Sequence, residues 1–96
     1  MRRDDVLRLL ESRKADLRRF GVRSLRLFGS VARDEAVEDS DVDLLVSLDG
    51  PPTFSSFMKL RIFLEDLLGA RVDLVTEKGL RDRIRPSVEK DAIRVA

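Results

Sequence analysis

The chain has 96 residues, of which 19 are Lys or Arg and 18 are Asp or Glu, and its net charge is +1. This length fits one domain, residues 1–96, and the charge balance gives no reason to expect direct nucleic-acid binding. There is no His and no Cys, which excludes Ser-His-Asp and Cys-His catalysis, disulfides and zinc–cysteine sites. No apolar run is long enough to cross a membrane and no signal-peptide core is present, so we expect a cytoplasmic protein.

The first half of the chain is predicted to contain one helix and two strands. Apolar residues at helical spacing predict an amphipathic helix over residues 4–20, ended by Gly21. Alternation predicts a strand over 22–28, which Gly29 and Ser30 break before a short helix at 31–35. After a polar loop, residues 41–48 are predicted to form a second strand. It is apolar on both faces after its acidic start, so we expect it to be internal.

The second half adds a long helix and a third strand. A helix is predicted over 53–68, capped by Thr53 or Ser55 and ended by Gly69. Its apolar residues wrap most of the way round, so it is either deeply buried or meets a partner. A third strand is predicted over 70–76, and a short helix or strand ends the chain over 92–95. This order predicts an α/β (α+β) fold in which helices flank a small mixed β-sheet.

Two acids open the second predicted strand. Asp41 and Asp43 are one residue apart in an extended segment, so their side chains point to the same side. Two adjacent carboxylates repel each other unless a cation joins them. Mg²⁺ fits, because it prefers oxygen ligands and commonly takes one or two carboxylates plus substrate phosphates. The alternative is a turn or cap signal with Asp43 merely solvated.

A third acid and a glycine turn extend this candidate site. Asp73 lies in an apolar strand, where an acid is costly unless it is paired or bound to metal. If the two acidic strands are neighbours, the carboxylates could hold two metal ions about 3.5–4 Å apart. The alternative is a salt bridge from Asp73 to Arg26 or Arg71. The turn before the acids, at residues 29–30, could offer backbone N–H groups to phosphates, or it could be an ordinary turn capped by Ser30.

Together these segments resemble one family. Gly-Ser-x-Ala-Arg at 29–33, Ser-Asp-x-Asp-Leu-Leu-Val at 40–46 and the later Val-Asp-Leu-Val strand resemble the DNA polymerase β-like nucleotidyltransferases. Within that superfamily the chain is most similar to the small prokaryotic minimal nucleotidyltransferases, also called MNT or MntA-like proteins. The resemblance covers almost the whole chain and implies the nucleotidyltransferase fold. Where many members have Gly after the Ala-Arg pair, this chain has Asp34, which puts a tight glycine turn there in doubt.

The resemblance also implies roles for individual residues. Gly29 and Ser30 would contact the nucleotide phosphates, and Arg33 would be a conformational or phosphate-side partner. All three acids would bind two Mg²⁺ ions, and one of them would act as the base toward the acceptor hydroxyl. By this resemblance the ion ligands would be Asp41, Asp43 and Asp73, and the base would be Asp73.

The function implied is transfer of AMP from ATP to a tyrosine of a HEPN-domain toxin, with this chain as the antitoxin of the pair. The chain contains no Tyr, so a tyrosine acceptor would lie on another protein. No acceptor-binding domain is appended, which argues against polymerase and antibiotic-modifying roles. The alternatives are a non-catalytic antitoxin that acts by contact, or a nucleotidyltransferase for RNA or a small molecule that uses a dimer cleft. A homo- or hetero-oligomer is expected, with the partner on the 53–68 helix or the basic segment 78–85.

Overall fold

The computed structural model describes residues 2–35, 41–50, 53–76 and 92–95, which form one sheet and its helices. The strands are β1 (Val22–Phe28), β2 (Val42–Leu48), β3 (Val72–Thr76) and β4 (Ile93–Arg94), in the spatial order β3-β2-β1-β4. β1 pairs antiparallel with both β2 and β4, whereas β2 and β3 are parallel. The predicted mixed sheet is confirmed, and β2 is internal as its apolar sequence predicted.

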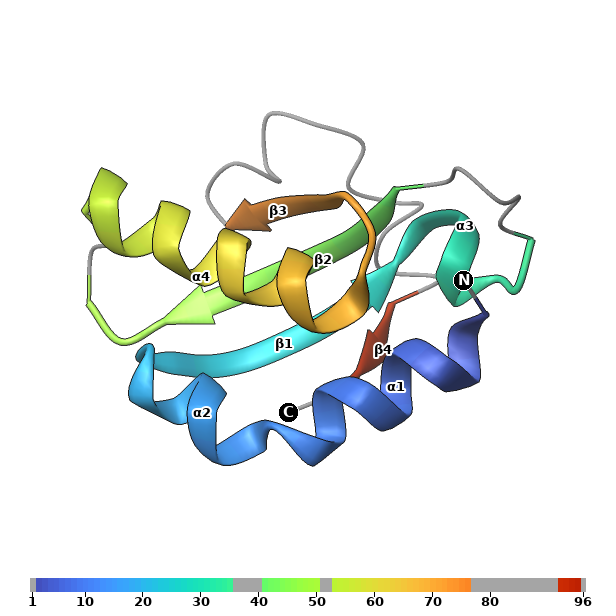
Figure 1. Cartoon of the computed structure of the whole chain (residues 1–96), viewed down its shortest axis with the longest axis horizontal. Coiled ribbons are helices and arrows are strands. Elements are labelled where there is room, and N and C mark those ends of the chain that lie inside the picture. The colour runs from blue at the N-terminus through green and yellow to red at the C-terminus, as the bar shows by residue number, and fades with distance from the viewer. Residues whose placement is uncertain (1, 36–40, 51–52, 77–91, 96) are drawn as a thin grey trace.

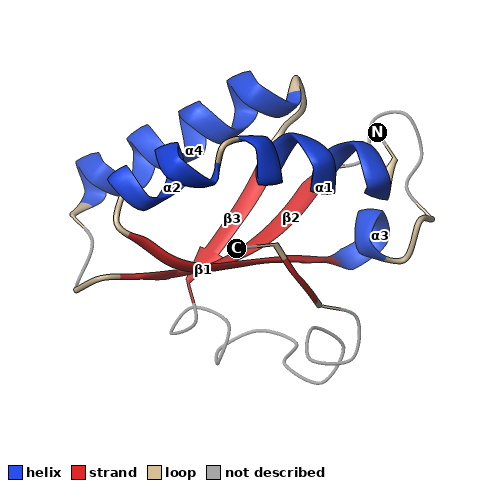
Figure 2. Ribbon diagram, turned by 90° about the horizontal axis from the view of Figure 1, so that it is seen from below, coloured by secondary structure: helices blue, strands red, loops and turns tan. Residues whose placement is uncertain are grey.

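Three helices cover one face of this sheet. They are α1 (Arg3–Ser12), α2 (Lys14–Arg19) and α4 (Phe54–Leu68), and Figure 2 shows all three on the same side. The short α3 (Gly29–Ala32) follows directly on β1 at one end of the sheet (Figure 1). Among the residues that the structure describes, no helix lies on the opposite face. None of the helices in the described ranges is long and apolar enough to cross a membrane.

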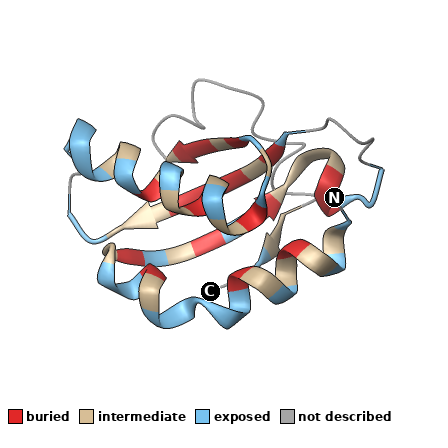
Figure 3. Cartoon of the chain, viewed as in Figure 1, coloured by how far each residue is buried: buried red, intermediate tan, exposed pale blue. Residues whose placement is uncertain are grey.

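The core lies between the helices and the sheet, and strand alternation decides which residues enter it (Figure 3). From the three longer strands, the core takes Val22, Leu25, Leu27, Val42, Leu44, Val46, Val72 and Leu74. A second, smaller cluster joins Leu45 and Val75 with Phe28 and Ala92. Since successive strand residues point to opposite faces, Asp43 and Asp73 share the face of this smaller cluster, away from the helices.

The helix predicted over 4–20 is two helices rather than one. The break is at Arg13, whose φ of −117° and ψ of 24° are not helical. Just before it, the Ser12 hydroxyl donates to the Leu9 carbonyl at 2.6 Å, and the Arg13 N–H donates to Leu10 at 3.1 Å. A serine that bonds back to the preceding turn offers the backbone an alternative to the helix. The apolar periodicity continues through the break, which is why the sequence pattern did not reveal it.

α4 buries one stripe and leaves other apolar residues outside. Leu60, Leu64 and Leu68 are buried, whereas Phe54 is 82% and Ile62 is 52% exposed. The sequence prediction that this helix has more apolar surface than one stripe requires is therefore confirmed. The basic segment 78–85, the other expected partner surface, lies outside the described residues.

The N-terminus of α4 provides the first test. The Ser56 N–H donates to the Thr53 hydroxyl at 3.0 Å, and the Thr53 N–H donates to the Ser56 hydroxyl at 3.1 Å. This reciprocal capping box satisfies two helix-end N–H groups. We expect Thr53→Ala to lower the free energy of unfolding by about 1 kcal/mol in urea titrations. Ser55→Ala, at an exposed position beside it, is the control and should change little. Equal losses in the two variants would contradict the cap assignment.

Candidate active site

The site begins at the turn between β1 and α3. Gly29 has φ +75°, a left-handed conformation that residues with a side chain rarely adopt. A Cβ placed on Gly29 would run directly into the carboxylate oxygen Oδ2 of Asp43. Glycine is therefore required here for two reasons, the backbone conformation and the close approach of Asp43. Ser30 follows in the first turn of α3 and is half-buried.

The sequence analysis put a tight turn after α3 in doubt, because Asp34 stands where many members of the family that the chain resembles have glycine. Asp34 has φ +58° and is the only described non-glycine residue with positive φ. Asp is among the few residues that visit this conformation, because its short polar side chain can bond locally. Its carboxylate accepts from the Arg3 N–H at 3.5 Å, at the start of α1. The tight turn is therefore kept without glycine.

Asp43 and Asp73 lie side by side on neighbouring strands. In the parallel pairing of β2 with β3, Asp43 is directly opposite Asp73. Cα atoms so paired are roughly 4.8 Å apart, and both side chains are on the same face. Both residues are half-buried. The structure thus confirms that the two acidic strands are neighbours, the condition on which the predicted convergence of carboxylates depended.

Asp41, two residues before Asp43, forms an ion pair instead. It precedes β2 and is exposed, and its Oδ1 is 3.1 Å from Nε of Arg71, the residue just before β3. Arg71 was one of the two cations considered as a partner for Asp73, and the structure places it on Asp41. Both side chains of this ion pair are substantially exposed, at 76% for the arginine and 48% for the acid. Such a surface pair contributes about 0–1 kcal/mol, so a ligand can displace it at little cost.

A pocket of about 250 Å³ lies beside β3 and includes two of the three predicted acids. It is lined by Asp41, Phe57, Arg61, Arg71, Val72, Asp73 and Leu74. Asp73 therefore belongs both to this pocket and to the pair with Asp43. Glu65 fixes the start of β3, because its Oε2 accepts from the Val72 N–H at 3.1 Å. The pocket combines acids that suit a cation with arginines that suit a phosphate.

The chemistry of these acids fits a magnesium ion. Among the described residues, no group of three or more acids is arranged to hold a metal by itself. Mg²⁺ commonly uses one or two protein carboxylates and completes its shell with water and substrate phosphates. Asp43 and Asp73, in register and on one face, match that requirement. Asp41 could join them when its exposed pair with Arg71 opens.

One residue of the arrangement, Arg61, was missed in the sequence, a second, Arg71, was considered only as a partner of Asp73, and one predicted residue is more peripheral. Arg61 comes from α4, four residues after Phe57 on the same side of the helix. Within the described part of the chain, its Nε is buried without a hydrogen bond and lies 3.7 Å from Glu65 Oε1. The periodicity of α4 could have marked Arg61, but only the register brings Arg71 to Asp41. Arg33 is exposed at the end of α3, with its Nε 3.2 Å from Glu35 Oε2.

Comparison with known proteins agrees with this geometry. Residues 8–95 match the family model of the nucleotidyltransferase domain. The protein adenylyltransferase MntA of Thermococcus cleftensis is 43% identical, over 96% of this chain and 94% of its own length.

Solved structures agree as well. A structure assigned as a minimal nucleotidyltransferase has a TM-score of 0.82 and 43% identity, covering 97% of this chain and 95% of that one. The complex of a tri-AMPylated Shewanella oneidensis HEPN toxin with an MNT antitoxin matches with a TM-score of 0.63 and 22% identity, over 94% of this chain and 71% of that one. At that identity the likeness shows the fold alone. The 43% relatives and the match over residues 8–95 confirm the family predicted from the motifs: the chain belongs to the nucleotidyltransferase-domain family, among its minimal, MntA-like members.

Proposed function

We propose that this chain transfers AMP from ATP to a hydroxyl group of a partner protein, with Mg²⁺, as the antitoxin of a HEPN/MNT toxin–antitoxin pair. The observation that carries the proposal is the in-register pair Asp43 and Asp73, with Gly29 packed against Asp43. The relative named protein adenylyltransferase MntA supports the reaction class. A tyrosine acceptor would lie on the partner, because this chain has no Tyr.

In the proposed reaction, the acceptor oxygen attacks the α-phosphorus of ATP. A bond forms between that oxygen and phosphorus, the bond to the pyrophosphate oxygen breaks, and pyrophosphate leaves. Asp73 takes the proton of the acceptor hydroxyl, because it lies in the pocket that such a group would enter. Asp43 and Asp73 would hold Mg²⁺, with Asp41 as a further ligand. The bound ion would neutralise charge on the phosphates.

The chain's own backbone and cations would hold the triphosphate. The first N–H groups of α3, from Gly29 and Ser30, have no partner within the helix and suit phosphate oxygens. Arg61 and Arg71 line the same pocket as Asp73 and can offer guanidinium N–H groups to the phosphate tail. The role of Arg33 near the phosphates stays a prediction. The expected acceptor interface on α4 also stays a prediction, and the exposure of Phe54 and Ile62 supports it.

The acids give the direct test of this proposal. The purified chain is incubated with α-labelled ATP, Mg²⁺ and the HEPN protein encoded beside it, and label on that protein is measured. Asp43→Asn and Asp73→Asn should each lower transfer at least about 100-fold, because each removes a charge that acts on the phosphates. Their unfolding free energies without metal should stay within about 1 kcal/mol of the wild type, because like charges opposite each other do not stabilise a sheet.

Asp41→Asn is the graded control for these variants. We expect a smaller loss of transfer, because Asp41 is exposed and paired with Arg71. Transfer that persists in Asp43→Asn and Asp73→Asn would contradict the site. Inhibition of the toxin by all three variants without any labelling would favour the non-catalytic antitoxin instead.

Gly29 provides a test of the close contact between the β1–α3 turn and the carboxylate of Asp43. Gly29→Ala should abolish transfer and destabilise the fold, because it adds a clash with Asp43 to the cost of the left-handed backbone, which is about 1–2 kcal/mol. Gly50→Ala is the matched control, since Gly50 has φ +79° but no neighbour within 4 Å of an added Cβ. It should show the backbone cost alone and keep its activity.

A double variant separates the two contributions. Asp43→Ala removes the carboxylate that Gly29→Ala would strike, so in Gly29→Ala/Asp43→Ala the loss of stability should be less than additive by about 0.5–3 kcal/mol. Strictly additive losses in urea titrations would show that the carboxylate does not lie against Gly29.

A further inference from the structure

Glu65 is an acid at a place where the helix itself does not favour one. It lies in the last turn of α4, which ends at Leu68, and negative charge there opposes the helix dipole. Its side chain is only 29% exposed. Burying a carboxylate is costly unless it is paired and hydrogen-bonded. The contacts of Glu65 therefore have to compensate for both effects.

Both carboxylate oxygens of Glu65 have such contacts. Oε2 accepts from the Val72 N–H at 3.1 Å, and Oε1 lies 3.7 Å from Nε of Arg61, four residues earlier on α4. A hydrogen bond to an ionised acceptor is about twice as strong as a neutral one. Arg61 and Val72 both line the pocket that contains Asp73. Glu65 thus joins α4 to the first residue of β3 at the border of the candidate active site.

The Val72 N–H needs this partner because it faces away from β2. The Val42 N–H donates to the Arg71 carbonyl at 2.9 Å, and along a strand the backbone groups of successive residues face opposite sides. Those of Val72 therefore face the outer side of β3, which is an edge strand of the described sheet. Val72 is only 2% exposed, and a buried N–H without a partner costs free energy.

The bond from Glu65 holds the residue directly before Asp73. On the inner side, β2 holds the Arg71 carbonyl, and the Val72 side chain is anchored in the core. Asp73 comes next and is directly opposite Asp43. Within the described sheet β3 is paired with β2 alone, so Glu65 attaches the start of the strand from its other side. Without this bond the start of β3, and with it the Asp73 carboxylate, could move relative to Asp43.

We propose that Glu65 is a positioning residue, which keeps Asp73 in place through its bond to the Val72 N–H. The inference rests on the proposed function in so far as the reaction is adenylyl transfer. Misplacing a reacting group by about 1 Å can cost roughly 100-fold in rate. Glu65 is not among the described residues that line the pocket. Its effect is therefore on the chemical step and on cation binding, and not on direct contacts with ATP.

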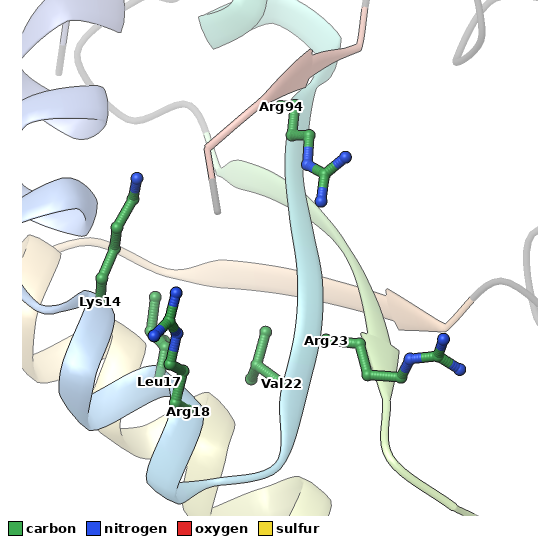
Figure 4. A pocket seen from close by; sticks show the side chains of 6 residues that line it. All are labelled: Lys14, Leu17, Arg18, Val22, Arg23 and Arg94. Atoms are coloured by element: carbon green, nitrogen blue, oxygen red, sulfur yellow. The ribbon is translucent and has the colours of Figure 1, made fainter.

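A second pocket provides the place for a control. It has a volume of about 130 Å³ and lies where α2 meets β1 and β4, at the opposite edge of the described sheet from β3. Figure 4 shows Lys14 extending there from α2. Lys14 lies 3.9 Å from Oε1 of Glu11, which is 70% exposed. Glu11→Asp is therefore the same substitution as Glu65→Asp, at an exposed helical position beside this other pocket.

Two variants separate the reach of Glu65 from its charge. Glu65→Asp keeps the charge but has a shorter side chain that no longer reaches the Val72 N–H, whereas Glu65→Gln loses the charge and keeps an oxygen there. Glu65→Asp should lower kcat of AMP transfer at least about tenfold, with KM for ATP within about threefold, and Glu65→Gln should keep kcat within about threefold. Glu11→Asp, and Asp66→Asn at the exposed neighbouring position, should stay within about twofold.

Two measurements without substrate report on the position of β3 itself. Hydrogen exchange of the Val72 amide should be faster in Glu65→Asp than in the wild type and in Glu65→Gln. Mn²⁺ binding, followed by broadening of the Asp43 and Asp73 amide signals, should weaken at least about threefold in Glu65→Asp and stay unchanged in the other variants. Circular dichroism checks the fold, and Glu65→Ala replaces Glu65→Asp if that variant is unfolded.

A purely structural role of Glu65 predicts a different result. The free energy of unfolding would fall, while kcat and Mn²⁺ binding of the folded protein stayed unchanged, and that result would overturn the proposal. A greater loss in Glu65→Gln than in Glu65→Asp would also overturn it, because the charge and not the bond to Val72 would then matter. If the wild type transfers no AMP, the proposed function fails, whereas Val72 exchange and Mn²⁺ binding still decide the role of Glu65.

Discussion

The parallel register between β2 and β3 is the constraint on which the rest of the site depends. It sets Asp41-Val42-Asp43 beside Arg71-Val72-Asp73. Val42 and Val72 enter the core, while Asp43 and Asp73 meet on the opposite face. Asp41 and Arg71, the residues just before β2 and β3, form an ion pair with each other. A slip of one residue would turn the valines outward and the acids into the core. Core packing therefore fixes the register, and the register assembles the site.

The antiparallel partner of β2 completes the arrangement from the other side. Phe28, the last residue of β1, is opposite Asp43, so the chain turns into α3 immediately beside that acid. Only glycine fits at position 29, because its φ is +75° and an added Cβ would strike the carboxylate of Asp43. This close packing limits where Asp43 can point. It also places the N-terminus of α3 next to Asp43.

Much of this arrangement could be predicted from the sequence, because strand alternation and the motifs are local. The bounds of β1 match the prediction, and β2 begins one residue later than expected. Spacing and the resemblance singled out Gly29, Asp43 and Asp73, which the structure brings together, while their roles stay predictions. A single sequence does not reveal the register of two strands, so the pairing of Arg71 with Asp41 could not be predicted from it. The break at Arg13 was hidden for another reason, since it depends on hydrogen bonds from Ser12 and Arg13 while the apolar pattern continues.

The central claim is that Asp43 and Asp73 form one cation site, and paramagnetic NMR with Mn²⁺ in place of Mg²⁺ tests it most directly. The account predicts that the amide signals of Gly29, Asp43 and Asp73 broaden first, and that Asp43→Asn/Asp73→Asn abolishes the effect. Broadening centred on other acids, such as Asp4 and Asp5, with these signals unchanged, would contradict it.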